Sequence, residues 1–271
     1  MNRNQVILIV VGLIAILGLY SLPTVVVDND NEQPTEFLNE SVPGGVVDHS
    51  SEVPEEIQPK IDFWKGQLFV NGNMQPTNEA LDSLMRVFME INQFDSAAFY
   101  AGQFAERFDN IESWQKAGDA YFEAFTFALD QQKVSLLGSK AREAYEKVLE
   151  AKPDNLDAKH NIAMTYIAGP SPMQGIMMLR EIIETDPQNE KALMSMGRMS
   201  IQTGQFENGI ERFQSLVNYY PNHIEGNFFL GVCFFEAGQM VKAKAQFDKI
   251  LTLDAPEQVL TAANEYLERI N

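Results

Sequence analysis

Residues 190–223 read EKALMSMGRMSIQTGQFENGIERFQSLVNYYPNH, and the segments 156–189 and 224–257 align to this stretch without a gap. The chain therefore repeats itself with a period of 34 residues. A segment of this length cannot bury its own apolar face, so neighbouring segments must stack to form a continuous core. A stacked array presents a concave surface rather than a catalytic pocket, which favours a binding or scaffolding protein.

Small and large side chains recur at fixed places in each unit. In the first half of successive units they are Trp114, Gly118 and Tyr121, then Ile162, Ala163 and Tyr166, then Met196, Gly197 and Ser200, then Leu230, Gly231 and Phe234. In the second half they are Ala141, Tyr145 and Pro153, then Gly175, Leu179 and Pro187, then Gly209, Phe213 and Pro221, then Ala243, Phe247 and Ala255, with the proline displaced to Pro256. The small residues allow paired helices to approach closely, the large ones fill the remaining space, and the prolines end each second helix.

These residues resemble the tetratricopeptide repeat family, whose 34-residue unit is a pair of antiparallel helices. The resemblance is specific over residues 111–257 and weak over 78–110. It implies an all-α solenoid, a right-handed superhelix of helical hairpins. It also implies that the first helix of each unit lines a concave groove in which a polypeptide segment binds.

The folded region is expected over residues 60–271, and it begins with a divergent unit at 78–110. One helix face of this unit carries the apolar residues Leu81, Leu84, Met85 and Phe88. This spacing is typical of an amphipathic helix. Asp95 or Ser96 is suited to cap the second helix of the unit.

Two departures from the regular period follow. The unit at 111–155 carries 11 more residues than the unit after it, around Thr126–Gly138, and we expect them to lengthen its hairpin. Insertions in repeats map to loops that are often functional, although a neutral lengthening explains this one equally well. Residues 257–270 follow the last unit and have an apolar stripe with a polar outer side. They are expected to form a capping helix that keeps the end of the array soluble.

An apolar run, VILIVVGLIAILGLY, occupies residues 6–20, and apolar character continues to Val27. As a helix, residues 6–27 would be about 33 Å long, enough for a hydrocarbon core of about 30 Å. Residues 1–27 are therefore expected to form an uncleaved transmembrane signal anchor. The alternative is a cleaved signal peptide, but the residues around Tyr20 do not resemble the small residues of a cleavage site.

The charges on the two sides of this run differ. Arg3 precedes it, and nine acidic residues follow it before Lys60. This asymmetry places the N-terminus in the cytoplasm and the repeats outside it, as in a single-pass inner-membrane protein with a periplasmic domain. Residues 28–59 are acidic and contain several prolines and glycines, so they are expected to form a disordered linker.

Composition and motifs exclude several functions. The formal net charge is −18, whereas nucleic-acid binding depends on clustered lysine and arginine, so we expect no nucleic-acid partner. The single cysteine, Cys233, permits neither an internal disulfide nor a thiolate cage. The three histidines lie far apart, and the chain has no phosphate-binding glycine loop and no nucleophile motif. The sequence therefore predicts no enzyme, no catalytic residues, no cofactor and no metal site.

Carried onto this chain, the groove positions of the family are expected to form the binding site. In the three regular units we select His160, Asn161, Met164, Ile167, Lys191, Met194, Arg198, Ile201, Gln202, Phe228, Val232 and Phe235. In the unit at Ile111 the same positions hold Glu112, Gln115, Lys116, Asp119, Phe122 and Glu123. The carboxylate clamp of the family's chaperone-tail binders is not reproduced, and only Asn161, Lys191 and Arg198 point to an anion site. The other interpretation is that several of these residues are core, or are covered by the helix at 257–270.

The function predicted from these features is a membrane-anchored, extracytoplasmic protein that binds other polypeptides. It would serve as a scaffold or ancillary chaperone in envelope protein translocation or assembly. The alternatives are an apocytochrome-binding factor of cytochrome c maturation, a fixed subunit of an envelope machine, and a homo-oligomer.

Overall fold

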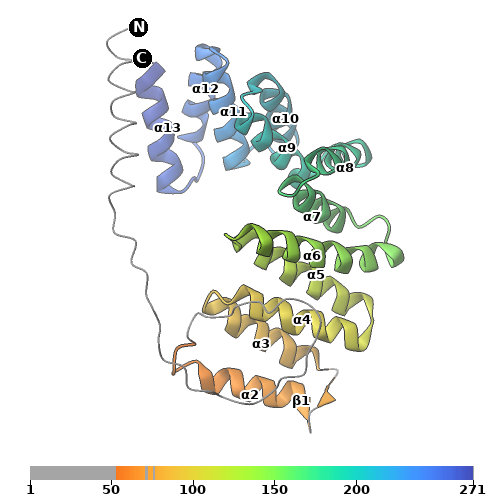
Figure 1. Cartoon of the computed structure of the whole chain (residues 1–271). Helices are drawn as coiled ribbons and strands as arrows, with labels where there is room; N and C mark the ends of the chain where they lie inside the picture. Colours follow the sequence, from red (N-terminus) through yellow and green to blue (C-terminus); the bar gives the residue numbers. More distant parts are fainter. Residues whose placement is uncertain (1–52, 71–72, 76, 271) are drawn as a thin grey trace, which may run out of the picture. The chain divides into compact units, whose positions relative to one another are not determined.

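The structure is a computed structural model that describes residues 53–70, 73–75 and 77–270 (Figure 1). Five helical hairpins follow one another along this part of the chain. They are α3/α4 (Asn78–Glu90, Phe94–Phe108), α5/α6 (Ile111–Phe127, Gln131–Ala151), α7/α8 (Leu156–Ile167, Pro172–Thr185), α9/α10 (Glu190–Gln202, Phe206–Tyr219) and α11/α12 (Ile224–Glu236, Met240–Ile250). Each helix packs against the next one in the chain, so the expected stack of hairpins is confirmed. The handedness of the superhelix stays a prediction.

The helices of the regular units begin where the 34-residue register places them. The helices α7, α9 and α11 begin at Leu156, Glu190 and Ile224, the first residues of the three units. The residue before each helix caps it, because its side chain accepts a hydrogen bond from the backbone N–H three residues later. These caps are Asn155, Asn189 and His223. A side chain that satisfies a free N–H at this position stabilises a helix by about 1 kcal/mol.

The small and large residues of the repeat pack as expected. In the α9/α10 hairpin, a Cβ placed on Gly197 would lie 2.5 Å from Cζ of Phe213. Gly118 and Tyr145 make the same contact in α5/α6, at 2.7 Å from the ring. Both rings are fully buried. A methyl group in place of either glycine hydrogen would therefore force the paired helices apart.

The insertion lengthens both helices of one hairpin. Helix α5 has 17 residues against 13 in α9, and α6 has 21 residues against 14 in α10. Together these differences account for the 11 additional residues. The turn end of α5/α6 therefore extends as regular helix rather than as a loop.

The divergent unit at 78–110 forms the expected hairpin, but its cap differs from the prediction. Helix α4 begins at Phe94 with Gln93 at the cap position, so Asp95 and Ser96 lie inside the first turn. The Ser96 hydroxyl donates to Oε1 of Gln93 at 3.2 Å. Asn92 adopts a left-handed φ of 58°, which turns the chain into the helix earlier than expected.

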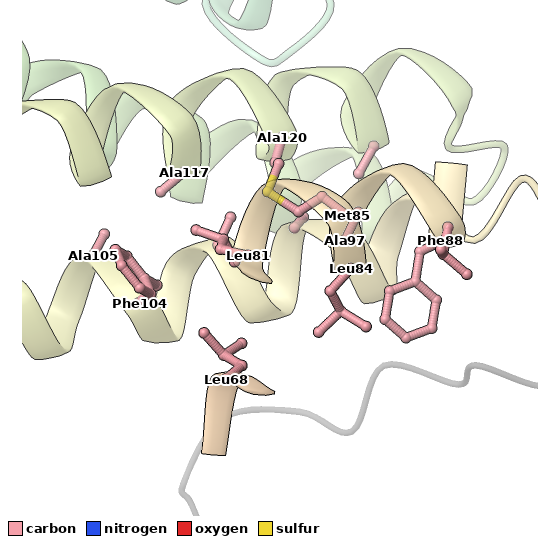
Figure 2. Packing of buried hydrophobic residues seen from close by; sticks show 14 of the residues in the cluster. Leu68, Leu81, Leu84, Met85, Phe88, Ala97, Phe104, Ala105, Ala117 and Ala120 are labelled. Atoms are coloured by element: carbon pink, nitrogen blue, oxygen red, sulfur yellow. The ribbon is translucent and has the colours of Figure 1, made fainter. Parts of the chain in front are cut away.

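Elements that the sequence did not predict precede this unit. They are α2 (Gln58–Leu68) and a short antiparallel pair, β1 (Phe69–Val70) and β2 (Asn73–Met74). Figure 2 shows Leu68 of α2 against Leu81 and Leu84 of α3, and all three are fully buried. Val53 and Ile57, inside the expected linker, also pack on this core, so the folded part begins before residue 60.

Helix α13 (Glu257–Ile270) packs on α12 through buried Ala263 and Leu267, as expected for a capping helix. The anchor expected at 1–27 and the linker up to residue 52 lie outside the described residues. Within the part of the chain that the structure describes, no helix is both long and apolar enough to span a bilayer.

Candidate functional site

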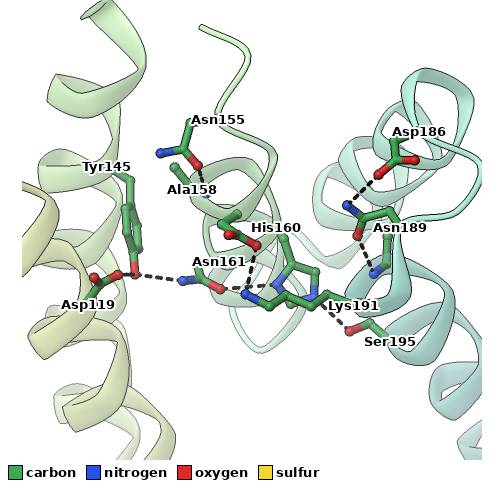
Figure 3. Close-up of polar contacts among 12 residues, drawn as sticks. Asp119, Tyr145, Asn155, Ala158, His160, Asn161, Asp186, Asn189, Lys191 and Ser195 are labelled. Carbon is green, nitrogen blue, oxygen red and sulfur yellow. Dashed lines mark hydrogen bonds and ion pairs between the residues drawn. The ribbon is translucent and has the colours of Figure 1, made fainter. Parts of the chain in front are cut away.

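A chain of hydrogen bonds runs across three units on the face of the first helices (Figure 3). The Tyr145 hydroxyl donates to Oδ1 of Asp119 at 2.8 Å and accepts from Nδ2 of Asn161 at 2.7 Å. Next to Asn161, the imidazole of His160 lies 3.2 Å from its Oδ1 through Nδ1 and 2.9 Å from Oγ of Ser195 through Nε2. The helices α5, α6, α7 and α9 are thereby joined by polar side chains.

Ion pairs connect the first helices of successive units. Nζ of Lys191 lies 2.8 Å from Asp157, and Nζ of Lys116 lies 2.6 Å from Asp82, each pair being 34 residues apart. These side chains are largely exposed or half-buried. Exposed pairs contribute about 0–1 kcal/mol each, so they align neighbouring units more than they stabilise them.

A hollow of about 290 Å³ opens beside this chain of hydrogen bonds. It is lined by Asp119, Phe122, Glu123, Thr126, Tyr145 and Asn161. Helix α5 supplies the first four residues, α6 supplies Tyr145 and α7 supplies Asn161. The hollow therefore lies where the lengthened unit meets the first regular one.

Burial shifts the pKa values of three groups on or near this face. It lowers the pKa of His160 below 6.5, with a smaller contribution from the positive charge of Lys191. It raises the pKa of Tyr145 well above 10, with the carboxylate of Asp119 as the second cause. It also raises the pKa of the Cys233 thiol to about 12. At neutral pH all three groups are uncharged.

The pairing of Ser195 and His160 has the distance of a nucleophile and its base. Acyl transfer also requires hydrogen-bond donors for the oxyanion. Both residues lie inside helices, α9 and α7, whose backbone N–H groups bond within their own helix. Within the described part of the chain no three His, Cys, Asp or Glu side chains are placed to hold a metal ion.

The three residues that pointed to an anion site each have a different partner in the structure. Asn161 bonds to Tyr145, Lys191 pairs with Asp157, and Arg198 pairs with Glu225 at 3.1 Å. Both cations already face a carboxylate. Their arrangement is therefore not that of a shared anion site.

The apolar groove residues fall into two groups. Met194 and Val232 are buried in the core, and Met164, Ile167 and Ile201 are partly buried against it. Phe228 and Phe235 meet Tyr266 of α13 at ring distances of 6.1 and 5.2 Å. These two residues are partly buried, and the capping helix contacts both of them. Gln202 is exposed.

The residues that line the hollow were not among the selected site residues, apart from Asn161. The register does place Asp119, Phe122 and Glu123 on the concave face. Tyr145 belongs to a second helix, and Thr126 lies beyond the normal length of a first helix. The signal that could have pointed to them is the insertion, since the additional turn of α5 supplies Thr126.

Comparison with known proteins agrees with the repeat register. A family model described as tetratricopeptide repeat matches residues 191–223. The solved structure of a tetratricopeptide repeat protein from Parabacteroides merdae ATCC 43184 is 15% identical over 79% of this chain and 82% of that chain, with a TM-score of 0.56. This likeness shows the fold.

Two other structures are similar at lower scores. MamA from Desulfovibrio magneticus RS-1, from residue 41 to its end, is 18% identical over 64% of this chain and 93% of that chain, with a TM-score of 0.49. YrrB, described as a TPR protein with an unusual peptide-binding site, is 16% identical over 78% of this chain and 98% of that chain, with a TM-score of 0.45. No curated protein matches the chain.

Proposed function

We propose that this chain, which has the fold of tetratricopeptide repeat proteins, is a non-enzymatic scaffold that binds a segment of another polypeptide along the first helices of its units. The observation that carries the proposal is the hollow of about 290 Å³ on this face, beside side chains that hydrogen bonds hold in place. Preorganised polar groups around a hollow bind a ligand at a low cost in side-chain entropy.

The bound segment would lie over the N-terminal and central units. Helix α13 already occupies the apolar surface of the last unit, through Tyr266 against Phe228 and Phe235. The units from α5 to α9 retain the polar first-helix face. This division favours a partner segment with polar and charged side chains over a purely apolar one.

The proposed location is the outer side of the inner membrane, with residues 1–27 as a single-pass anchor and the N-terminus in the cytoplasm. The support is the apolar run at 6–20 and the charge asymmetry around it. In this position the array would act as an ancillary chaperone or scaffold for proteins that are translocated or assembled in the envelope.

Site-specific photocrosslinking of the full chain in its native membrane tests the binding face. A benzoylphenylalanine is placed at Thr126, Met164 or Gln202 on the first helices. The matched controls are the exposed second-helix positions Glu146, Arg180 and Gln214. Adducts with other polypeptides from the first set and none from the second would support the proposal. Adducts of equal yield from both sets, or from neither set, would overturn it.

The adducts also separate the possible roles. Many different adducts indicate a chaperone, one adduct in a fixed ratio indicates a subunit of a machine, and adducts with the chain itself indicate a homo-oligomer.

Protease accessibility tests the location. In spheroplasts, external protease should degrade the repeats only if they lie outside the cytoplasm, and the chain should resist extraction by alkaline carbonate. Protection from the protease, or release by carbonate, would contradict the proposed location.

A further inference from the structure

The hollow beside Tyr145 is lined by an aromatic ring and two carboxylates. Phe122 contributes an aromatic side chain, and Asp119 and Glu123 contribute carboxylates, one turn apart on α5. Residues four apart on a helix lie on the same face, so the two carboxylates border the same opening. The volume of about 290 Å³ is at the lower end of ligand pockets, which fits one long side chain better than a cofactor.

The carboxylate of Asp119 is held in place before any ligand arrives. Its Oδ1 accepts from the Tyr145 hydroxyl at 2.8 Å and from Nε2 of Gln115 at 2.9 Å. Tyr145 is fully buried and is itself oriented by Asn161, so Asp119 is supported from the core. Both of these bonds use the same oxygen. Across residues 53–70, 73–75 and 77–270, no hydrogen bond reaches its Oδ2.

In the part of the chain that the structure describes, the two carboxylates lack a cationic partner. Three other first-helix acids have one: Asp157 pairs with Lys191, Asp82 with Lys116 and Glu225 with Arg198. Across the described ranges, no lysine, arginine or histidine forms an ion pair with Asp119 or Glu123. Two adjacent negative charges in a hollow attract a cation from a partner.

The chain shows elsewhere how a ring and a carboxylate receive a cation. The guanidinium of Arg198 lies 5.3 Å from the ring centre of Phe229 and 3.1 Å from Oε2 of Glu225. Phe122 with Asp119 and Glu123 offers the same chemistry without the arginine. A planar guanidinium can stack on a ring and bond to carboxylates at once, whereas an ammonium group makes point contacts.

We propose that the hollow lined by Asp119, Phe122 and Glu123 is a subsite for an arginine side chain of the bound polypeptide. This inference rests on the proposed function, since it names one side chain that the groove recognises. The guanidinium of the arginine stacks on the ring of Phe122 and bonds to the two carboxylates. The insertion takes part in the site, because the lengthened α5 places Thr126 on its wall.

The test is an NMR titration of the full chain in lipid nanodiscs, with threonine methyl groups labelled by ¹³C. The probe is N-acetyl-arginine amide, and the matched control is N-acetyl-citrulline amide, which has nearly the same shape and no charge. We expect the arginine probe to shift the Thr126 methyl signal in a saturable way, and the shift to weaken as salt rises. The citrulline probe should leave the signal in place.

Two variants make the result specific. Glu123→Gln leaves the hydrogen bonds of Tyr145 intact and should weaken binding of the arginine probe by about tenfold or more, because it removes a charged acceptor. Glu207→Gln, an exposed substitution on α10, should bind the probe as the wild type does. Equal shifts with arginine and citrulline, or unchanged binding in Glu123→Gln, would overturn the subsite.

The crosslinking experiment separates the two proposals. If partner adducts form at Thr126 in both the wild type and Glu123→Gln with equal yield, the scaffold function stands and the arginine subsite fails. If the arginine probe binds as described but no first-helix position yields an adduct, the hollow binds arginine and the scaffold function fails.

Discussion

The hydroxyl of Tyr145 donates a hydrogen bond to Oδ1 of Asp119 at 2.8 Å, from the second helix of a hairpin to the first. Tyr145 is buried, and Asp119 is exposed at the edge of the hollow. A residue whose ring fills the core thus orients a carboxylate on the binding face. The core and the proposed binding site therefore share this hydrogen bond.

Tyr145→Phe keeps the ring and removes the hydroxyl that bonds to both Asp119 and Asn161. We expect the free energy of unfolding to fall by about 1–2 kcal/mol, because the Asn161 amide and the carboxylate lose a partner. Urea denaturation measures this change. Tyr219→Phe, at a largely exposed tyrosine, is the control and should change stability by less than about 0.5 kcal/mol. Equal effects of the two substitutions would show that the hydroxyl of Tyr145 contributes nothing.

His160→Gln should alter how stability depends on pH. Burial lowers the pKa of His160 below 6.5, so between the folded pKa and 6.5 the unfolded chain binds more protons than the folded one. The wild type therefore loses stability as pH falls through this window. The stabilisation that comes from neutral, buried His160 is fully present above about pH 6.5. Urea midpoints from pH 8 to pH 5 should converge or cross between wild type and variant below pH 6.5. Parallel profiles would contradict the assignment.

The effect of Gly209→Ala on the free energy of unfolding should change sign with the residue at position 233. A Cβ on Gly209 would lie 2.7 Å from Sγ of Cys233, so in the wild type the substitution should cost about 1–3 kcal/mol. In a Cys233→Ala background the sulfur is absent. Alanine at position 209 should then stabilise helix α10 by up to about 1 kcal/mol relative to glycine. A double-mutant cycle measures the difference. An additive result would show that the two side chains do not meet.

Cys233 should resist alkylation in the folded protein. Its thiol is buried and its pKa is raised to about 12, whereas the reactive form is the thiolate. Iodoacetamide at pH 8 should label the native chain much more slowly than the urea-unfolded chain, as followed by intact mass. Labelling at similar rates in both states would mean that the helix around Cys233 opens readily.

Tyr266→Ala tests the role of the capping helix. Tyr266 stacks on Phe247 at 4.8 Å and meets Phe235 edge-on at 5.2 Å. Loss of the ring should lower the free energy of unfolding by about 2–4 kcal/mol. It should also increase the binding of a hydrophobic dye, because apolar surface of the last unit becomes exposed. Val241→Ala, at an exposed position on α12, is the control and should change neither quantity. If Tyr266→Ala also changes neither quantity, α13 does not cover apolar surface of the last unit.

The helical hairpins could be predicted because their signals are local. Helix starts at Leu156, Glu190 and Ile224 follow from the register, and the extra turns of α5 and α6 follow from the insertion. The cap of α4 was predicted wrongly, since Asp95 and Ser96 fit the composition of a cap but the left-handed turn at Asn92 moves the start to Phe94. Helix α2 was missed because its apolar residues are too few for a clear periodicity.

The binding face could be predicted only as a set of positions. The register assigns Asp119, Asn161 and His160 to the first-helix face, but it says nothing about which of them meet. Phe228 and Phe235 occupy the same kind of position and contact α13 instead.

The sequence by itself determined the repeat, the pairing of small and large residues within each hairpin, and the residues at the first-helix positions of each unit. These features depend on spacing along the chain, and spacing is preserved when the chain folds into helices. Only the tertiary structure decided that Tyr145 orients Asp119, that His160 meets Ser195, and that the lengthened hairpin borders a hollow. Such contacts depend on how one unit packs on the next, and small rotations between units are set by the whole interface rather than by any single position.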